Sequence, residues 1–198
     1  MNLGIDLGTS NSAVVGVDDS GLRLFKTDDG KDVLASVIYF DRRGHMTIGT
    51  RAQAQAELSP DNVAQGFKRL MGTSSTIDLE GADKSLTPEE ASSEIIRQLL
   101  RQVESETGTG EFAGAIITIP AAFDQMQSEA TIRAAHAAGL SKVGLLQEPV
   151  AAAMAALEGA TRRDGRFLIY DLGGGTFDLA LVEASGGAVN VIAHEGIK

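Results

Sequence analysis

The chain of 198 residues contains no cysteine, so disulfide scaffolds, thiolate metal sites and cysteine nucleophiles are all excluded. Basic residues are in the minority: 17 Lys and Arg against 27 Asp and Glu give a net charge of −10, which argues against nonspecific binding to nucleic acid or to an anionic membrane. No apolar run is long enough to span a bilayer, and no basic and apolar leader precedes the first strand-like run. We therefore expect a cytoplasmic protein that binds neither nucleic acid nor membrane.

The usual nucleotide fingerprints are absent as well, since the sequence has neither a Walker A motif nor Gly-x-Gly-x-x-Gly. The three histidines, His45, His136 and His194, share no metal-ligand spacing. We interpret them as structural or surface residues. A polyanionic ligand such as ATP would have to be bound by local geometry.

An internal duplication is the most informative feature that is present. Residues 169–182 resemble residues 4–15, and in each copy an apolar strand ends in Asp-Leu-Gly, turns through small residues and returns as a second apolar strand. Each copy therefore predicts a hairpin. Glycine lets backbone N–H groups approach an anion closely, and successive N–H groups in a tight turn form an anion-binding concavity. Asp6 and Asp171 would then lie where Mg²⁺ needs oxygen ligands or water acceptors.

The rest of the chain predicts alternating strands and helices around these hairpins. Thr87, Pro88 and Glu90 form a helix-start signal with an N-cap, a proline at the first helical position and a capping box. The stretch 30–86 is more polar and predicts an inserted subdomain, in which 36–40 and 46–48 could pair. Strands are expected at 2–7, 12–17, 22–26, 115–119, 143–147, 166–172, 177–184 and 188–194, and helices at 88–107, 125–138 and 148–157.

Five segments carry a family resemblance in a fixed order. They are 5–12, 67–72, 116–120 with the helix to 140, 148–153 and 171–178. The pattern resembles the actin-like ATPase superfamily and, within it, the DnaK-type heat-shock chaperones. The Lys-Arg-x-Met-Gly-Thr motif that ends at Thr73, with a short insert, looks closer to the specialised HscC branch than to DnaK itself.

The resemblance implies an α/β fold of the actin-like ATPase (ribonuclease H-like) class. A first lobe with a mixed five-stranded sheet and helices would cover residues 1–165, with the inserted subdomain at about 30–86. The first strands of a second, duplicated lobe would follow at 166–198. Adenine recognition, the rest of that lobe and a peptide-binding domain would lie beyond Lys198. We therefore expect the 198-residue chain alone to be a weak or inactive ATPase.

The resemblance also implies a set of site residues for ATP or ADP and Mg²⁺, which fits the demands of phosphoryl transfer. Lys68 would reach the γ-phosphate and Glu148 would help to place the attacking water. The candidate catalytic residues are Lys68, Glu148, Asp171 and Thr176. The phosphates would be wrapped by Gly8, Thr9 and Ser10 on one side and by Gly173, Gly174, Gly175 and Thr176 on the other. The magnesium would be organised by Asp6, Asp171 and Asp178.

Simpler interpretations exist for single residues. Taken alone, Lys68 resembles a solvated surface lysine, Glu148 a first-turn helix acid and Asp178 a strand-end turn residue. The motifs around Lys68 and Glu148 favour function. Two positions depart from the family pattern, because Ala122 and Ser128 stand where an aromatic residue and an arginine are usual. We expect phosphate binding to survive these changes, since neither position belongs to the phosphate loops, whereas coupling of ATP to substrate release is put in doubt.

The predicted function is that of a chaperone ATPase domain, whose hydrolysis switches a separate domain between weak and tight grip on unfolded peptide. Implied partners of the full-length protein are unfolded clients, a J-domain co-chaperone and a nucleotide exchange factor. One alternative is an actin-like filament ATPase, although bacterial members usually have Thr-Thr-Glu where this chain has Thr-Phe-Asp at 176–178. A sugar kinase of the same superfamily is a further alternative.

Overall fold

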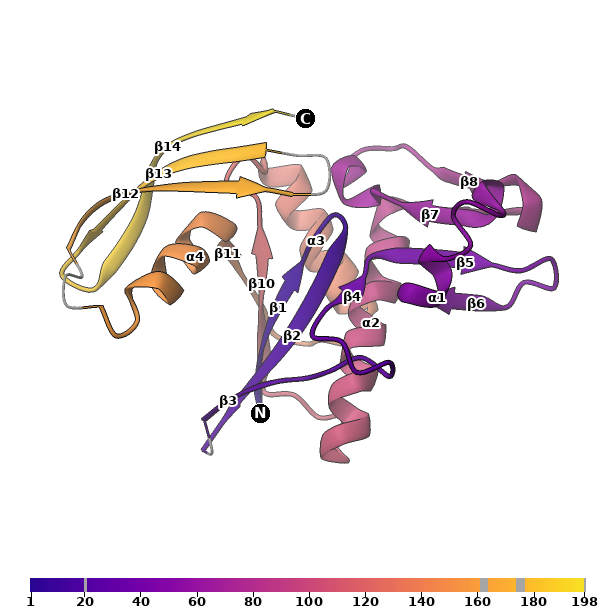
Figure 1. The fold of residues 1–198 in the computed structure, drawn as a ribbon, viewed down its shortest axis with the longest axis horizontal. Coiled ribbons are helices and arrows are strands. Elements are labelled where there is room, and N and C mark those ends of the chain that lie inside the picture. Colours follow the sequence, from indigo (N-terminus) through magenta and orange to yellow (C-terminus); the bar gives the residue numbers. More distant parts are fainter. Residues whose placement is uncertain (20, 161–163, 174–176, 198) are drawn as a thin grey trace. The chain divides into compact units, whose positions relative to one another are not determined.

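The computed structural model describes residues 1–19, 21–160, 164–173 and 177–197 (Figure 1). The chain divides into two compact units, Met1–Ile117 with Gln125–Gly144, and Thr118–Asp124 with Leu145–Lys198. These bounds differ from the predicted lobes because the helix that follows residue 147 packs on the last three strands and is grouped with them. The division into lobes at 165 remains a prediction.

The main sheet of the first unit has the order β11-β10-β1-β2-β3, with the short β4 beside β2. β1 pairs parallel to β10 and antiparallel to β2, so the predicted mixed five-stranded sheet is confirmed, with β4 as a sixth strand. Leu3, Ile5 and Leu7 alternate with more exposed residues along β1 and are buried. The strands are β1 (Asn2–Leu7), β2 (Asn11–Asp18), β3 (Gly21–Leu24), β4 (Leu34–Ala35), β10 (Gly114–Ile119) and β11 (Val143–Gln147).

Two long helices, α2 (Pro88–Thr107) and α3 (Gln125–Ala137), pack against each other, and α2 also packs on β1 and β2. The predicted capping box is present: the backbone N–H of Glu90 donates to Thr87 Oγ1 over 3.1 Å, and that of Thr87 donates to Glu90 Oε2 over 2.8 Å. No helix in the described part of the chain is long and apolar enough to cross a membrane. The buried face of α2 includes Ala91, Ile95, Leu99 and Val103, which follow one another at four-residue intervals.

The inserted region folds into two small sheets. One has the order β6-β5-β7, and its antiparallel β5–β6 pair confirms the predicted pairing; the other joins β8 and β9. The elements are β5 (Val37–Phe40), β6 (Met46–Ile48), α1 (Thr50–Gln53), η1 (Pro60–Asn62), β7 (Val63–Gln65), η2 (Phe67–Leu70), β8 (Ile77–Leu79), η3 (Glu80–Ala82) and β9 (Lys84–Leu86).

Asp41 holds the turn between β5 and β6. Its Oδ1 accepts hydrogen bonds from the backbone N–H groups of His45 (2.9 Å) and Arg43 (2.8 Å), and its Oδ2 lies 3.0 Å from His45 Nδ1. The backbone N–H of His45 is the largest cause that lowers the pKa of Asp41, and it outweighs the partial desolvation of the carboxyl group.

A pH dependence follows from this turn. Because the pKa of Asp41 is lower in the folded than in the unfolded chain, its ionised form stabilises the hairpin above the unfolded-state pKa, and this contribution is lost as the pH falls through the folded-state pKa. We expect the Asp41 carboxyl carbon, followed by NMR, to titrate below the midpoint of the same residue in an unstructured peptide. The hairpin amides of Asp41→Asn should lose this pH dependence. A midpoint at or above the peptide value would contradict the prediction.

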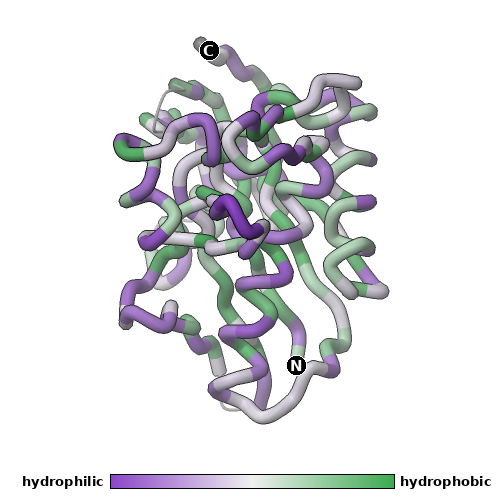
Figure 2. The backbone as a smooth tube through the Cα atoms, turned by 90° about the vertical axis from the view of Figure 1, so that its right-hand side faces the viewer, coloured by the Kyte–Doolittle hydropathy of each residue, from purple (hydrophilic) through white to green (hydrophobic). Residues whose placement is uncertain are grey.

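The second unit consists of α4 (Glu148–Leu157) packed on one face of an antiparallel sheet in the order β12-β13-β14. The core between them joins Ala153 of α4 to Ala180 and Val182 of β13. Figure 2 shows hydrophobic and hydrophilic stretches interspersed along the backbone. The strands are β12 (Gly165–Leu172), β13 (Phe177–Ser185) and β14 (Ala188–Ile197), as predicted, with β14 extending further.

Candidate active site

The two predicted hairpins have the same strand register. Leu7 faces Ser12 at the end of the β1–β2 ladder, and Leu172 faces Phe177 at the end of the β12–β13 ladder, so a four-residue tip follows in each case. The aspartate of each Asp-Leu-Gly lies one residue before the closing pair. The duplication inferred from the sequence is therefore confirmed as a repeat of strand pairing. Gly173 begins the second tip, and Gly174, Gly175 and Thr176 lie outside the described residues.

A pair of buried serines holds the first tip, which is formed by residues 8–11. Ser12 Oγ accepts from the backbone N–H of Gly8 (3.2 Å), and Ser36 Oγ donates to the carbonyl oxygen of Gly8 (2.8 Å). The two hydroxyl oxygens are 2.9 Å apart, and the backbone N–H of Ser36 donates to Ser10 O (2.8 Å). An added Cβ on Gly8 would lie 2.0 Å from Asn11 O, so this position requires glycine. The protein's own hydrogen bonds and the tight fit at Gly8 therefore support the shape of the tip.

Lys68 lies in η2 and is only 5% exposed, so it is not a solvated surface lysine. The segment around it packs against both long helices. Ser92 Oγ of α2 lies 3.3 Å from the sulfur of the buried Met71, and a Cβ on Gly72 would lie 2.8 Å from the backbone nitrogen of Gln127 in α3. This packing makes the backbone that carries Lys68 a rigid support.

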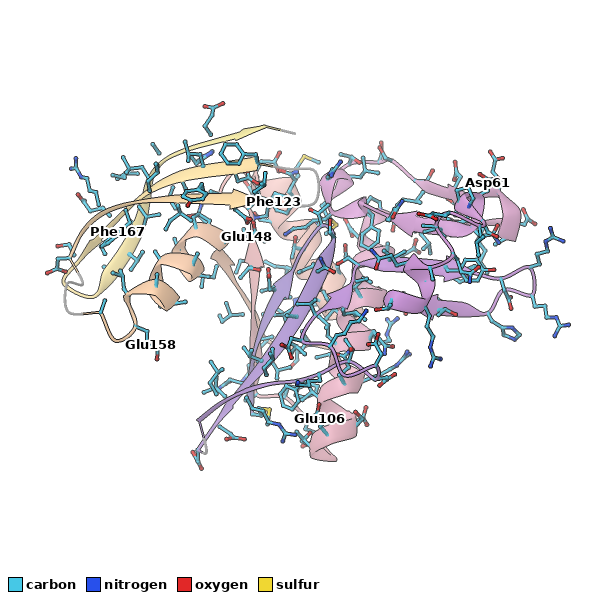
Figure 3. All side chains as sticks on the ribbon, in the orientation of Figure 1. Asp61, Glu106, Phe123, Glu148, Glu158 and Phe167 are labelled. Atoms are coloured by element: carbon cyan, nitrogen blue, oxygen red, sulfur yellow. The ribbon has the colours of Figure 1, made fainter. Side chains whose placement is uncertain are left out.

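A cavity of about 290 Å³ lies within the second unit, and three of the predicted site residues line it together: Glu148, Asp171 and Asp178. Glu148 is the first residue of α4 (Figure 3), where the positive end of the helix dipole stabilises its ionised form. Small residues on α4, on β13 and in the 118–124 segment leave the space open. They are Ala121, Ala122, Pro149, Ala152 and Ala180.

Asp171 and Asp178 face each other across β12 and β13. Asp178 also leans over the next strand, because a Cβ built on its register partner Gly196 would lie 2.5 Å from Asp178 Oδ1. Gly196 therefore makes room for the carboxylate, a role that no local sequence pattern indicates.

The aspartate pair fits a magnesium ion in its chemistry. Mg²⁺ in nucleotide sites is usually bound through one or two carboxylates, phosphate oxygens and waters, and does not need a full protein cage. Accordingly, no group of three or more acidic or histidine side chains that could hold a metal occurs within the described ranges. Asp6, the third predicted magnesium residue, belongs to the first unit, as do Lys68 and the first tip.

Two residues outside the predicted site set, His194 and Ala122, also line the cavity that Glu148 lines. Ala122 is not part of either hairpin tip, and His194 is exposed on β14, in agreement with a surface residue. Strand pairing brings it to the cavity, and no sequence spacing could have revealed that.

The doubled hairpin, the mixed sheet with its helices and the carboxylate-lined cavity define an α/β domain of the actin-like ATPase fold. Comparison with known proteins agrees. The family model described as Hsp70 protein matches residues 2–78 and 73–197. The chain belongs to the Hsp70 family.

Its relatives include proteins named Chaperone protein DnaK from several bacteria. The chain is 36% identical to that of Thermotoga neapolitana over 195 residues, 39% to that of Mycoplasmopsis agalactiae over 194 and 40% to that of Metamycoplasma hominis over 195. Each match covers 98% of this chain and 32% of the relative, so the chain spans about a third of the length of these proteins. The family match does not favour the filament or sugar-kinase alternatives.

Proposed function

We propose that the chain forms part of the ATP-binding and ATP-hydrolysing domain of a DnaK-like chaperone that assists protein folding through an ATP-driven conformational cycle. The observation that carries the proposal is the cavity that Glu148, Asp171 and Asp178 line together, next to the pair that closes the second hairpin. Membership of the Hsp70 family supports it. These are the groups that magnesium-dependent phosphoryl transfer needs: acids for a metal and an acid for a water nucleophile.

Phosphate binding is assigned to the two hairpin tips. The β- and γ-phosphates would be bound from one side by Gly8, Thr9 and Ser10. They would be bound from the other side by residues 173–176. The serine-supported shape of the first tip favours this role, because preorganised N–H donors lose little entropy when an anion binds. That both tips enclose the same phosphates rests on the family resemblance.

Asp6, Asp171 and Asp178 would hold Mg²⁺ or its waters. The ion, when bound, would neutralise charge on the phosphates. Glu148 accepts a hydrogen bond from the attacking water, aligns it with the γ-phosphorus and takes up its proton as a general base. Lys68 offsets negative charge on the transferred group, and its rigid, buried support keeps the ammonium group from being fully screened by solvent.

We propose a cytoplasmic protein whose partners are unfolded clients, a J-domain co-chaperone and a nucleotide exchange factor, and which is HscC-like in its Lys68–Thr73 motif. We propose a first lobe at 1–165 and the start of a second, duplicated lobe at 166–198. Ala122 and Ser128 would weaken the coupling between hydrolysis and substrate release. The matched relatives cover a longer chain, so we propose that the 198 residues alone bind ATP poorly.

Single-turnover phosphate release from Mg-ATP tests the function. It is measured on the natural polypeptide at its full length, with and without an unfolded peptide. We expect slow release that the peptide accelerates. Release that is indifferent to peptide would overturn the chaperone cycle and leave another actin-like ATPase, which light scattering would identify as a filament if ATP causes polymerisation. Absence of any release would overturn the ATPase assignment.

A further inference from the structure

His194 lines the cavity of the second unit, and none of the proposed roles uses its side chain. The described lining of the cavity carries negative charge from three elements of the unit: Glu148 on α4, Asp171 on β12 and Asp178 on β13. Among the described lining residues, His194 alone can carry a positive charge. An imidazole at such a place is the natural counterpart of an anionic ligand.

Strand register fixes where His194 stands. It is opposite Ala180, and Ala180 is opposite Ile169, so the three residues form one row across the sheet. Ala180 is buried against Ala153 of α4, so this row is on the face of the sheet that α4 covers. Two residues further along the strands, on the same face, comes the row of Asp171, Asp178 and Gly196. His194 therefore lies one row from Asp171 and Asp178, on the same α4-covered face of the sheet.

The small residues of the cavity matter to this side chain. Ala121 and Ala122 line the same space, and neither has atoms beyond Cβ to fill it. An imidazole on β14 can then reach into the open volume without displacing a neighbour. Mg²⁺ prefers oxygen ligands, so an imidazole in this cavity is better suited to donate to a phosphate oxygen than to bind the metal.

We propose that His194 is a phosphate contact: its imidazole N–H donates a hydrogen bond to the terminal phosphate of bound ATP and makes the site prefer ATP to ADP. The inference rests on the proposed function, because it takes the acids of the cavity to surround the reacting phosphate. ADP lacks the γ-phosphate, so the hydrogen bond from His194 forms with ATP only. A purely structural histidine would affect both nucleotides alike.

The test compares ATP and ADP affinities of three variants of the natural polypeptide at its full length. Binding is measured by rapid-mixing competition against a fluorescent ADP analogue and read before turnover. His194→Leu should weaken ATP binding about tenfold and change ADP binding less than about twofold, as expected for a lost hydrogen bond to a charged group. His194→Gln, which keeps an N–H donor, should recover most of the ATP affinity. His45→Leu, at an exposed histidine of the β5–β6 turn, should change neither.

If His194→Leu weakens ATP binding and ADP binding equally, the proposal is overturned in favour of a structural role. Unchanged affinities for both nucleotides would also overturn it, because His194 would then make no contact with either. A wild-type protein that binds neither nucleotide would instead overturn the proposed function from which the inference starts. The two failures are therefore distinguishable in one experiment.

Discussion

Replacing Glu148 by glutamine should slow ATP hydrolysis roughly 100-fold or more while ATP affinity stays nearly constant, because a positioned general base contributes typically 10²–10⁴-fold to a rate. Glutamine fills the volume of glutamate, so the cavity keeps its shape. The amide, however, cannot accept the proton of the attacking water. Glu148 begins α4 and lines the cavity with the aspartate pair, which makes it the acid best placed for this role. The measurement is single-turnover phosphate release together with equilibrium binding of ATP.

The same helix offers a matched control. Glu158 is the C-cap residue of α4 and is exposed at the opposite end from Glu148 (Figure 3). Glu158→Gln makes the identical chemical change outside the cavity and should leave the rate unaltered. An unchanged rate in Glu148→Gln would remove Glu148 from the mechanism. Equal losses in both variants would point to a disturbed helix.

The second large effect is expected at Gly8. Gly8→Ala places a methyl group 2.0 Å from Asn11 O, an overlap that only a backbone shift can relieve. Such a shift breaks the hydrogen bonds that Gly8 shares with Ser12 and Ser36 and misdirects the N–H groups of the tip. We expect ATP affinity to fall about 100-fold or more, since each hydrogen bond to a charged group is worth about 1.5–3 kcal/mol and more than one would be lost. Calorimetry with Mg-ATP measures it.

Two further variants distinguish a specific effect on phosphate binding from a general loss of folding. Gly110→Ala adds a Cβ that meets its nearest atom, Glu104 Oε1, at 3.4 Å, which is ordinary contact, and ATP affinity should be kept. Ser36→Ala removes the hydroxyl that donates to Gly8 O without adding any atom, and should weaken ATP binding about threefold to tenfold. Normal ATP affinity in Gly8→Ala would contradict the assignment of this tip to phosphate.

Local signals predicted most of the elements. The Thr87 capping box defines the start of α2, and period-two alternation marks β1 because one face of that strand is buried. The duplicated Asp-Leu-Gly predicted both hairpins and their common register. Such features depend on residues close in the chain, so they can be read without knowledge of distant contacts.

The site was only partly predictable for the same reason. Glu148, Asp171 and Asp178 were identified through motifs, and the structure brings them to one cavity. Ser36 and His194 have no motif, because their positions depend on long-range pairing: Ser36 reaches the first tip from beside β4, and His194 reaches the cavity from β14.

The sequence by itself determined the order of strands and helices, the repeated hairpin and its acids, and hence the family. These follow from turn chemistry, capping and apolar periodicity, which act over a few residues. Tertiary structure alone decided that α4 belongs with the last three strands, that a serine pair supports the first tip, and that a histidine lies one strand row from the cavity carboxylates. Side chains far apart in the chain meet only when sheets pair and helices pack, and no local pattern encodes which of them will share a cavity.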